Sequence, residues 1–239
     1  MAGTEYVALS GMRARLEQLD QLAADIANIG TTGYKGTRQS HVAAPRDSFG
    51  DTLQTAIDAT TGDKHLDMTP GTLVPTGRSL DVALDGDGFF VVNTPNGTRY
   101  TRDGHFLRAD DGTLTTDDGA VVQGTNGPIK LGAGDTKIDE HGAVWSGATQ
   151  VGQLAVVTFP DTGSLLPEGG ATFNANGETP TPVATPSVHA GMLEESNVSM
   201  SDRLAELTDL SRSFEALQKA ISLTFNDVTG RAIDVLGKR

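Results

Sequence analysis

Apolar residues recur at steps of three and four at both ends of the chain, which is the spacing of one face of an α-helix. Near the beginning, this face is formed by Leu9, Met12, Leu16, Leu19, Ala23 and Ile26. Near the end, it is formed by Leu207, Leu210, Phe214, Leu217, Ile221, Thr224 and Val228. The pattern predicts a helix over residues 3–29, ended by Gly30 and Gly33, and a second helix over residues 199–236.

The middle of the chain has a different period. From Leu80 to Phe159 apolar and polar residues alternate, and Asp-Gly or Asn-Gly pairs separate the alternating runs. These pairs permit the positive φ angles of tight hairpin turns. We therefore predict short strands joined by hairpins, over residues 80–84, 89–93, 98–102, 106–109, 113–116, 120–123, 129–131, 136–138, 143–145 and 153–159.

The order of these elements predicts an α+β fold. Two long terminal helices would pair as a coiled-coil stalk, a short extended connector domain would follow, and a central all-β head would be built from hairpins. The predicted segments are the N-terminal stalk helix 1–33, the connector 34–77, the β head 78–186, the return segment of the connector 187–198, and the C-terminal stalk helix 199–239.

The apolar faces of the two helices need more cover than the helices give each other. The sequence predicts no further helices, and two helices alone bury too little apolar surface to be stable. We therefore expect these faces to meet other copies of the chain, and the ordinary core of a four-helix bundle is the alternative. The residues expected at this contact, called here the helix stripe, are Leu9, Met12, Leu16, Leu19, Ile26, Leu207, Leu210, Phe214, Leu217, Ile221 and Val228.

Composition narrows the classes of partner. The net charge of −13 argues against nucleic acid, because phosphate binding needs a basic surface. No stretch is long and apolar enough to cross a membrane, so we expect no membrane insertion. The chain starts without the basic and apolar regions of a cleavable secretory signal. The absence of cysteine excludes disulfides and thiolate chemistry.

No motif for catalysis or for a cofactor is apparent. The five histidines occur singly, and the acidic turn around Asp85 and Asp87 lacks the spacing of a calcium loop. The adjacent carboxylates Asp139-Glu140 and Glu194-Glu195 would point to opposite faces of a strand. We expect no catalytic residue, no metal site and no cofactor.

Three groups of residues resemble the axial proteins of the bacterial flagellum, the rod and hook group. Residues 9–12 and 25–35 are similar to the rod motif, a helix ending in NNxANxxTxGFK. Residues 80–92, with 100–106 and 112–114, form the second similarity. Residues 191–198 and 212–215 form the third. One departure is that Ala24-Asp25 stands where the motif has paired asparagines.

This resemblance implies a non-enzymatic structural subunit of the basal-body rod. Terminal helices would form an inner tube, and Asn28, Thr31, Gly33, Tyr34 and Lys35 would make the turn out of it. Ser196 and Asn197 would lead into the return helix. Residues 231–237 look more like the proximal-rod type than the distal-rod type.

The resemblance also implies partners and a location. The partners would be other copies, neighbouring rod proteins and the flagellar type III export apparatus, and the location would be the basal body in the periplasmic space, reached without a cleaved signal. A distal-rod or hook-type protein is the alternative within the family. A secreted, β-rich, adhesin-like binding module with a helical oligomerisation stalk is the alternative from another class.

Overall fold

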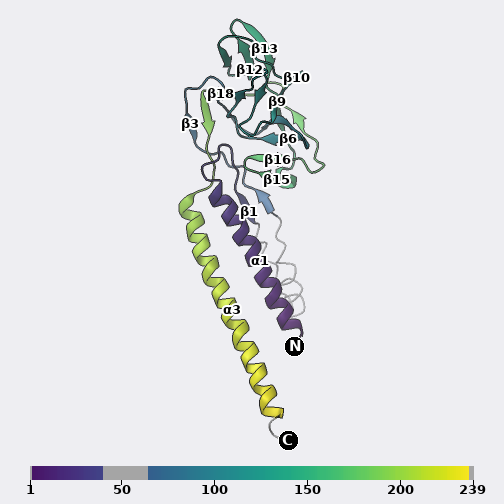
Figure 1. Ribbon diagram of the computed structural model, residues 1–239, viewed down its shortest axis with the longest axis vertical. Helices are drawn as coiled ribbons and strands as arrows, with labels where there is room; N and C mark the ends of the chain where they lie inside the picture. The colour runs from purple at the N-terminus through teal and green to yellow at the C-terminus, as the bar shows by residue number, and fades with distance from the viewer. Residues whose placement is uncertain (1, 40–63, 237–239) are drawn as a thin grey trace. The chain divides into compact units, whose positions relative to one another are not determined.

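The computed structural model describes residues 2–39 and 64–236 (Figure 1). Within these residues the chain divides into two compact units. The helical unit contains α1 (Ala2–Ala27) up to Ile26 and α3 (Met200–Leu236). The β unit contains residues 27–38 and 64–198. Each unit is described separately below.

The described residues contain the two expected helices, of 26 and 37 residues, the N-terminal one being the shorter. Neither has a proline inside it, and both are rich in Ala and Leu, which favour helix. At the end of α1, the Thr31 N–H donates to the Asn28 carbonyl at 3.0 Å, and Gly33 adopts a φ of 67°. The turn that ends the helix therefore forms around the predicted glycines.

The predicted coiled-coil stalk is wrong. A coiled coil buries one apolar row along its whole length, but within the predicted row Leu16 is 51% exposed, and Leu207 and Phe214 are only half-buried. Among the described side chains, the buried residues of α1 are Leu22 and Asp25, which lie outside the predicted stripe, and the buried residue of α3 is Leu210, which belongs to it. The Asp25 carboxylate pairs with the Arg203 guanidinium at 3.1 Å. A polar pair thus occupies a position that a coiled-coil seam would fill with apolar side chains.

The β unit is built around one large sheet. Its strands follow the order β15-β16-β6-β5-β9-β8-β7, with β10 beside β9, and with β14 beside β5 and β17. The bounds are β5 (Phe89–Thr94), β6 (Gly97–Thr101), β7 (Leu107–Arg108), β8 (Leu114–Thr115), β9 (Val121–Gly124), β10 (Gly127–Pro128), β14 (Val156–Thr158), β15 (Leu166–Gly169), β16 (Thr172–Asn174) and β17 (Thr181–Pro182).

Smaller sheets complete the unit. One has the order β11-β12-β13, and the others are the pairs β1-β2, β18-β4 and β19-β3. Their bounds are β1 (Thr37–Gln39), β2 (Lys64–Leu66), β3 (Leu73–Pro75), β4 (Val82–Leu84), β11 (Thr136–Ile138), β12 (Ala143–Ser146), β13 (Thr149–Gln153), β18 (Val188–Ala190) and β19 (Met192–Glu194). A short 3₁₀ helix, η1 (Thr162–Ser164), precedes β15.

Strand β5 is covered on both of its faces. Phe90 and Val92 belong to one apolar cluster, whereas Phe89 belongs to a second cluster with Tyr100 and Phe173. The Phe89 ring meets the Phe173 ring edge to face at 5.6 Å between centroids. Burial on both faces explains why this strand reads as the unbroken apolar run Phe-Phe-Val-Val rather than as an alternation.

The glycine turns lie where the sequence predicts hairpins. Gly112 and Gly119 both adopt a φ of 82°, and their N–H groups donate to Ala109 and Thr116 at 2.9 and 3.0 Å. The predicted single strand over 153–159 is wrong, because β13 ends at Gln153 and β14 begins at Val156. The hairpin of β15 and β16 was not predicted, since Pro167, Gly169 and Gly170 suggest loop rather than strand.

Candidate functional site

The predicted motif turn lies inside the β unit. Gly33 lies so close to the residues that follow β6 that a Cβ atom there would come within 2.4 Å of the Arg102 backbone carbon. Its φ of 67° also excludes most other residues. Next to it, the Thr32 hydroxyl donates to the Asp103 carboxylate at 2.5 Å. Burial raises the pKa of Asp103, and the Thr32 hydrogen bond opposes that rise. The turn is therefore fixed by both steric fit and hydrogen bonding.

The backbone on both sides of Lys35 is held by segments distant in sequence. The Gly33 N–H donates to the Glu194 carbonyl at 2.7 Å. The Gly36 N–H donates to Asn197 Oδ1 at 2.9 Å, and the Gly36 carbonyl accepts from the Asp67 N–H at 2.8 Å. Residues 32–36, called here the motif segment, thus bridge residues 67–71 and 194–197.

Lys35 is the most deeply buried charge of this arrangement. Its side chain is 0% exposed, and Nζ donates to Glu194 Oε1 at 2.6 Å and to the Thr69 carbonyl at 2.9 Å. Burial lowers the pKa of Lys35, and the pairing with Glu194 opposes that change. A charged lysine is tolerated in this buried position because its ammonium group and the Glu194 carboxylate are both hydrogen-bonded.

The Glu194 carboxylate forms ion pairs with two buried cations, Lys35 and Arg102. Its Oε1 also accepts from the Gly71 N–H at 2.9 Å, and its Oε2 lies 3.5 Å from Arg102 Nη1. Arg102 Nη2 donates to the Gly86 carbonyl at 2.7 Å, and burial lowers the pKa of Arg102. One carboxylate therefore compensates two buried positive charges, so its removal should cost more than the removal of either cation.

Asn197 closes the site with its side-chain amide. Its Nδ2 donates to the Asp67 carbonyl at 2.6 Å and to the Thr69 carbonyl at 3.1 Å. Together with the bond from Gly36 to its Oδ1, this side chain therefore bridges the motif segment and residues 67–69. It does so three residues before α3 begins at Met200. Beside it, the Ser196 hydroxyl accepts from the Val198 N–H at 3.2 Å.

The predicted helix stripe has mixed exposure. Leu210 is buried, Leu16 is exposed, and the other described members (Met12, Leu19, Ile26, Leu207 and Phe214) are half-buried. The side chains of Leu9, Leu217, Ile221 and Val228 lie outside the described part of the structure. Sequence reasoning missed the Asp25–Arg203 pair. Asp25 was noted only as a departure from the rod motif, and the signal that it is buried lies in Arg203, far along the chain.

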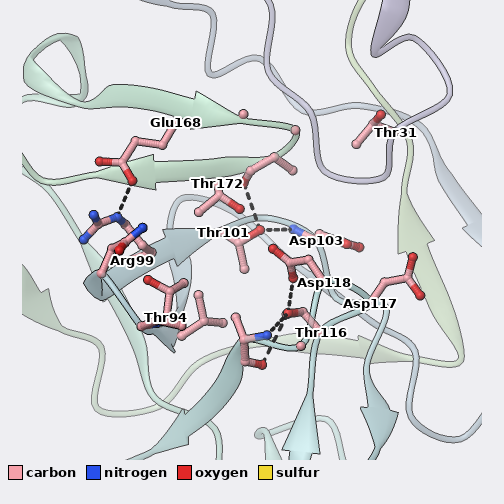
Figure 2. Close-up of a pocket in the computed structure, with 18 residues that line it drawn as sticks. Thr31, Thr94, Arg99, Thr101, Asp103, Thr116, Asp117, Asp118, Glu168 and Thr172 are labelled. Atoms are coloured by element: carbon pink, nitrogen blue, oxygen red, sulfur yellow. Dashed lines mark hydrogen bonds and ion pairs between the residues drawn. The ribbon is translucent and has the colours of Figure 1, made fainter.

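An open groove of about 600 Å³ lies beside the turn residue Thr31, between the β5–β6, β8–β9 and β15–β16 turns (Figure 2). Figure 2 shows Arg99 and Glu168 facing each other, and the hydroxyl of Thr116 meeting Asp118. The distance between Arg99 Nε and Glu168 Oε2 is 2.5 Å. The Thr101 hydroxyl donates to the Ala171 carbonyl at 2.9 Å. These contacts join groups that line the groove to one another and stabilise the turns around it.

Metal binding and membrane crossing find no support in the described residues. Among them no three His, Asp or Glu side chains gather closely enough to hold a metal ion. The helices, as far as they are described, contain no stretch with the length and apolarity that a membrane crossing requires.

The fold and this site define a chain whose N-terminal and C-terminal segments are tied together by buried contacts in a β unit. Two family models match it: the flagellar hook protein FlgE/F/G D1 domain over residues 83–146, and the flagellar basal body rod FlgEFG protein C-terminal domain over residues 189–228.

Whole-length relatives agree with these matches. The chain is 32% identical to the flagellar basal-body rod protein FlgF of Caulobacter vibrioides over 98% of this chain and 97% of the relative. It is 31% identical to FlgF of Rhizobium meliloti (97% of each) and to the rod protein FlgG of Bacillus subtilis (91% and 93%). The chain belongs to the family of flagellar basal-body rod proteins, and the resemblance noted in the sequence is confirmed.

Proposed function

We propose that this chain is a structural subunit of the proximal part of the flagellar basal-body rod, a tubular shaft that transmits torque. Two observations support this proposal. The similarity to FlgF proteins spans nearly the whole of both chains, and the family is one of structural rod proteins. The adhesin-like alternative is not favoured by these relatives.

The observation that carries the mechanism is the buried joint around Lys35. A subunit that transmits torque must resist twisting where its terminal segments enter the β unit. The joint fixes the segment that follows α1 and the segment that precedes α3 through one ion pair at 2.6 Å and several backbone hydrogen bonds. Such contacts have little freedom to shear, because each buried polar group would lose its partner.

The predicted connector domain, 34–77 with 187–198, is part of the same proposal. Lys35 and Thr69 come from its first segment, whereas Glu194 and Asn197 come from its second. Strand β3 pairs with β19 across the same two segments, with Val74 opposite Leu193. These contacts support treating the two segments as one structural element.

Assembly would use apolar side chains of the helices. Leu16 and Leu204 are about half exposed, and Phe214 is half-buried. Burying the remaining exposed part of such side chains against other copies would contribute roughly 1 kcal/mol each, about half of what a fully exposed side chain would give. The partners would be other copies and neighbouring rod proteins in the periplasmic space, after delivery by the flagellar type III export apparatus without a cleaved signal.

Substitution of Phe214 tests this proposal. Phe214→Asp should abolish assembly into sedimentable rods and motility while Trp145 fluorescence shows a folded β unit, because a charge replaces an apolar contact. The matched control Phe214→Leu keeps an apolar side chain and should retain most assembly. If the Phe214→Asp variant still supports swimming, assembly does not depend on the helix stripe.

A further inference from the structure

The motif segment is held in the β unit in the way that a bound peptide is held. Most of the contacts described above for this segment are made with residues at least 31 positions away, as in the hydrogen bond from the Asp67 N–H to the Gly36 carbonyl, and the Tyr34 N–H also donates locally to the Thr31 carbonyl at 3.3 Å. The Lys35–Glu194 pair spans 159 positions. Backbone groups of Gly33 and Gly36 supply hydrogen bonds, and buried side chains supply selectivity. This division is typical of sites that bind extended peptides.

The site has strict demands on the peptide. At Gly33 it leaves no room for a side chain, because the Arg102 and Asp103 backbone atoms lie 2.4 Å from the position of a Cβ. At Lys35 it requires an ammonium group between Glu194 Oε1 and the Thr69 carbonyl. It also buries Tyr34 to 7% exposure. A peptide that carries Gly-Tyr-Lys-Gly satisfies all of these groups together.

We propose that residues 67–71, 101–103 and 194–197 form a peptide-binding site, and that the motif segment of a second copy of this chain can fill it. No contact described above depends on the segment being covalently joined to the site, so an identical segment from another copy makes the same contacts. Within one copy, the covalent link gives the segment an effective concentration of the order of millimolar, which keeps the site filled by its own segment.

A labelled peptide of residues 30–39 provides the first test, using the full-length chain as receptor. In the Gly33→Val variant the chain's own segment no longer fits, because the added carbons meet the Arg102 backbone. This variant should bind the peptide about tenfold or more tightly than the wild type does, since its own segment no longer competes. A peptide carrying Lys35→Met is the matched control and should not bind, because it cannot satisfy Glu194.

Two defective copies provide the second test. The Gly33→Val chain has an intact site and a defective segment, whereas the Glu194→Gln chain has an intact segment and a defective site. A mixture of the two should form a heterodimer in analytical ultracentrifugation, and each variant alone should stay monomeric. This result separates the proposal from assembly through the helix stripe when both chains also carry Phe214→Asp.

Folding of the variants is checked first by Trp145 fluorescence. Lys35→Ala is a second receptor if Gly33→Val does not fold. If neither folds alone, the peptide added during refolding should restore the native fluorescence of Trp145. The proposal is overturned if folded receptors bind neither the peptide nor the complementary chain, or if the peptide fails to restore folding of the unfolded ones.

Discussion

Replacing Lys35 with methionine tests the central ion pair. Methionine keeps most of the volume of the lysine stem and removes the ammonium group. Breaking a buried pair by removing one partner costs about 3–5 kcal/mol. Glu194 would keep the Gly71 N–H at 2.9 Å and Arg102 at 3.5 Å, so we expect the low end, about 3 kcal/mol. In the β unit, a loss of about 3 kcal/mol in the free energy of unfolding should lower Tm by roughly 6–12 °C.

The same reasoning ranks a second substitution. Glu194→Gln removes the one carboxylate that both Lys35 and Arg102 face, and leaves two buried cations without it. It should cost about 5 kcal/mol or more, and therefore more than Lys35→Met does.

Urea unfolding followed by Trp145 fluorescence measures both losses. Trp145 lies in β12, where its Nε1–H donates to Asp139 at 3.0 Å, so it reports on the β unit. The control is Lys130→Met, which removes an exposed ammonium and should change stability by no more than about 0.5 kcal/mol. If Lys35→Met is as stable as the wild type, or if Glu194→Gln costs less than Lys35→Met, the account of the charge balance is refuted.

Three further predictions concern neighbouring groups. Asn197→Ala removes hydrogen bonds to Gly36 and to residues 67–69 and should lower the free energy of unfolding, measured in urea, by about 2–3 kcal/mol. Asn197→Asp should cost at least as much, because its carboxylate keeps the acceptor for Gly36 but faces the Asp67 and Thr69 carbonyl oxygens without a donor. Burial pushes the pKa of Asp67 upward, but hydrogen bonds from Thr69 and Arg38 outweigh burial and hold the pKa below the ordinary value of 3.8. The stabilisation by the ionised Asp67 is therefore present above pH 3.8 and is lost as the pH falls through the folded-state pKa. Asp67→Asn should reduce the fall of the urea midpoint at acid pH, and an unchanged fall would contradict this. Arg203→Met removes the guanidinium 3.1 Å from the buried Asp25 and should lower the free energy of unfolding by about 3 kcal/mol, as followed by the helix signal in circular dichroism. The control Glu206→Gln removes the exposed partner of Arg203 and should lower it by about 0.5 kcal/mol or less.

Local sequence patterns predicted the elements well where a local rule decides them. The pairs Asp111-Gly112 and Asp118-Gly119 allow the positive φ angles of the turns, and the hairpins of β7, β8 and β9 follow from these turns. The end of α1 was likewise predictable, because Gly30 and Gly33 interrupt the helical pattern.

The periodicity of the helices could not reveal which neighbour covers them. The stripe through Leu16 and Leu19 predicts an apolar face, but the structure buries Leu22 and Asp25 instead. Asp25 is a poor candidate for a buried residue until its partner Arg203 is known. The coiled-coil interpretation failed because it assigned the partner from spacing alone.

The chemistry of the site was also hidden from local patterns. Lys35 and Asn197 were chosen through the family resemblance, whereas Glu194 and Arg102 were not. Sequence patterns extend over a turn of helix or a hairpin, and the pair of Lys35 and Glu194 joins residues 159 positions apart. Such a pair can be recognised only once the sheets have placed β19 and the motif segment together.

That separation has a consequence for the order of biosynthesis. A ribosome adds about 5–20 residues per second, so Lys35 waits roughly ten to thirty seconds before Glu194 has been added. Until then its ammonium group remains hydrated, because no carboxylate is present to make burial favourable. The joint around Lys35 therefore cannot close before Glu194 has been synthesised.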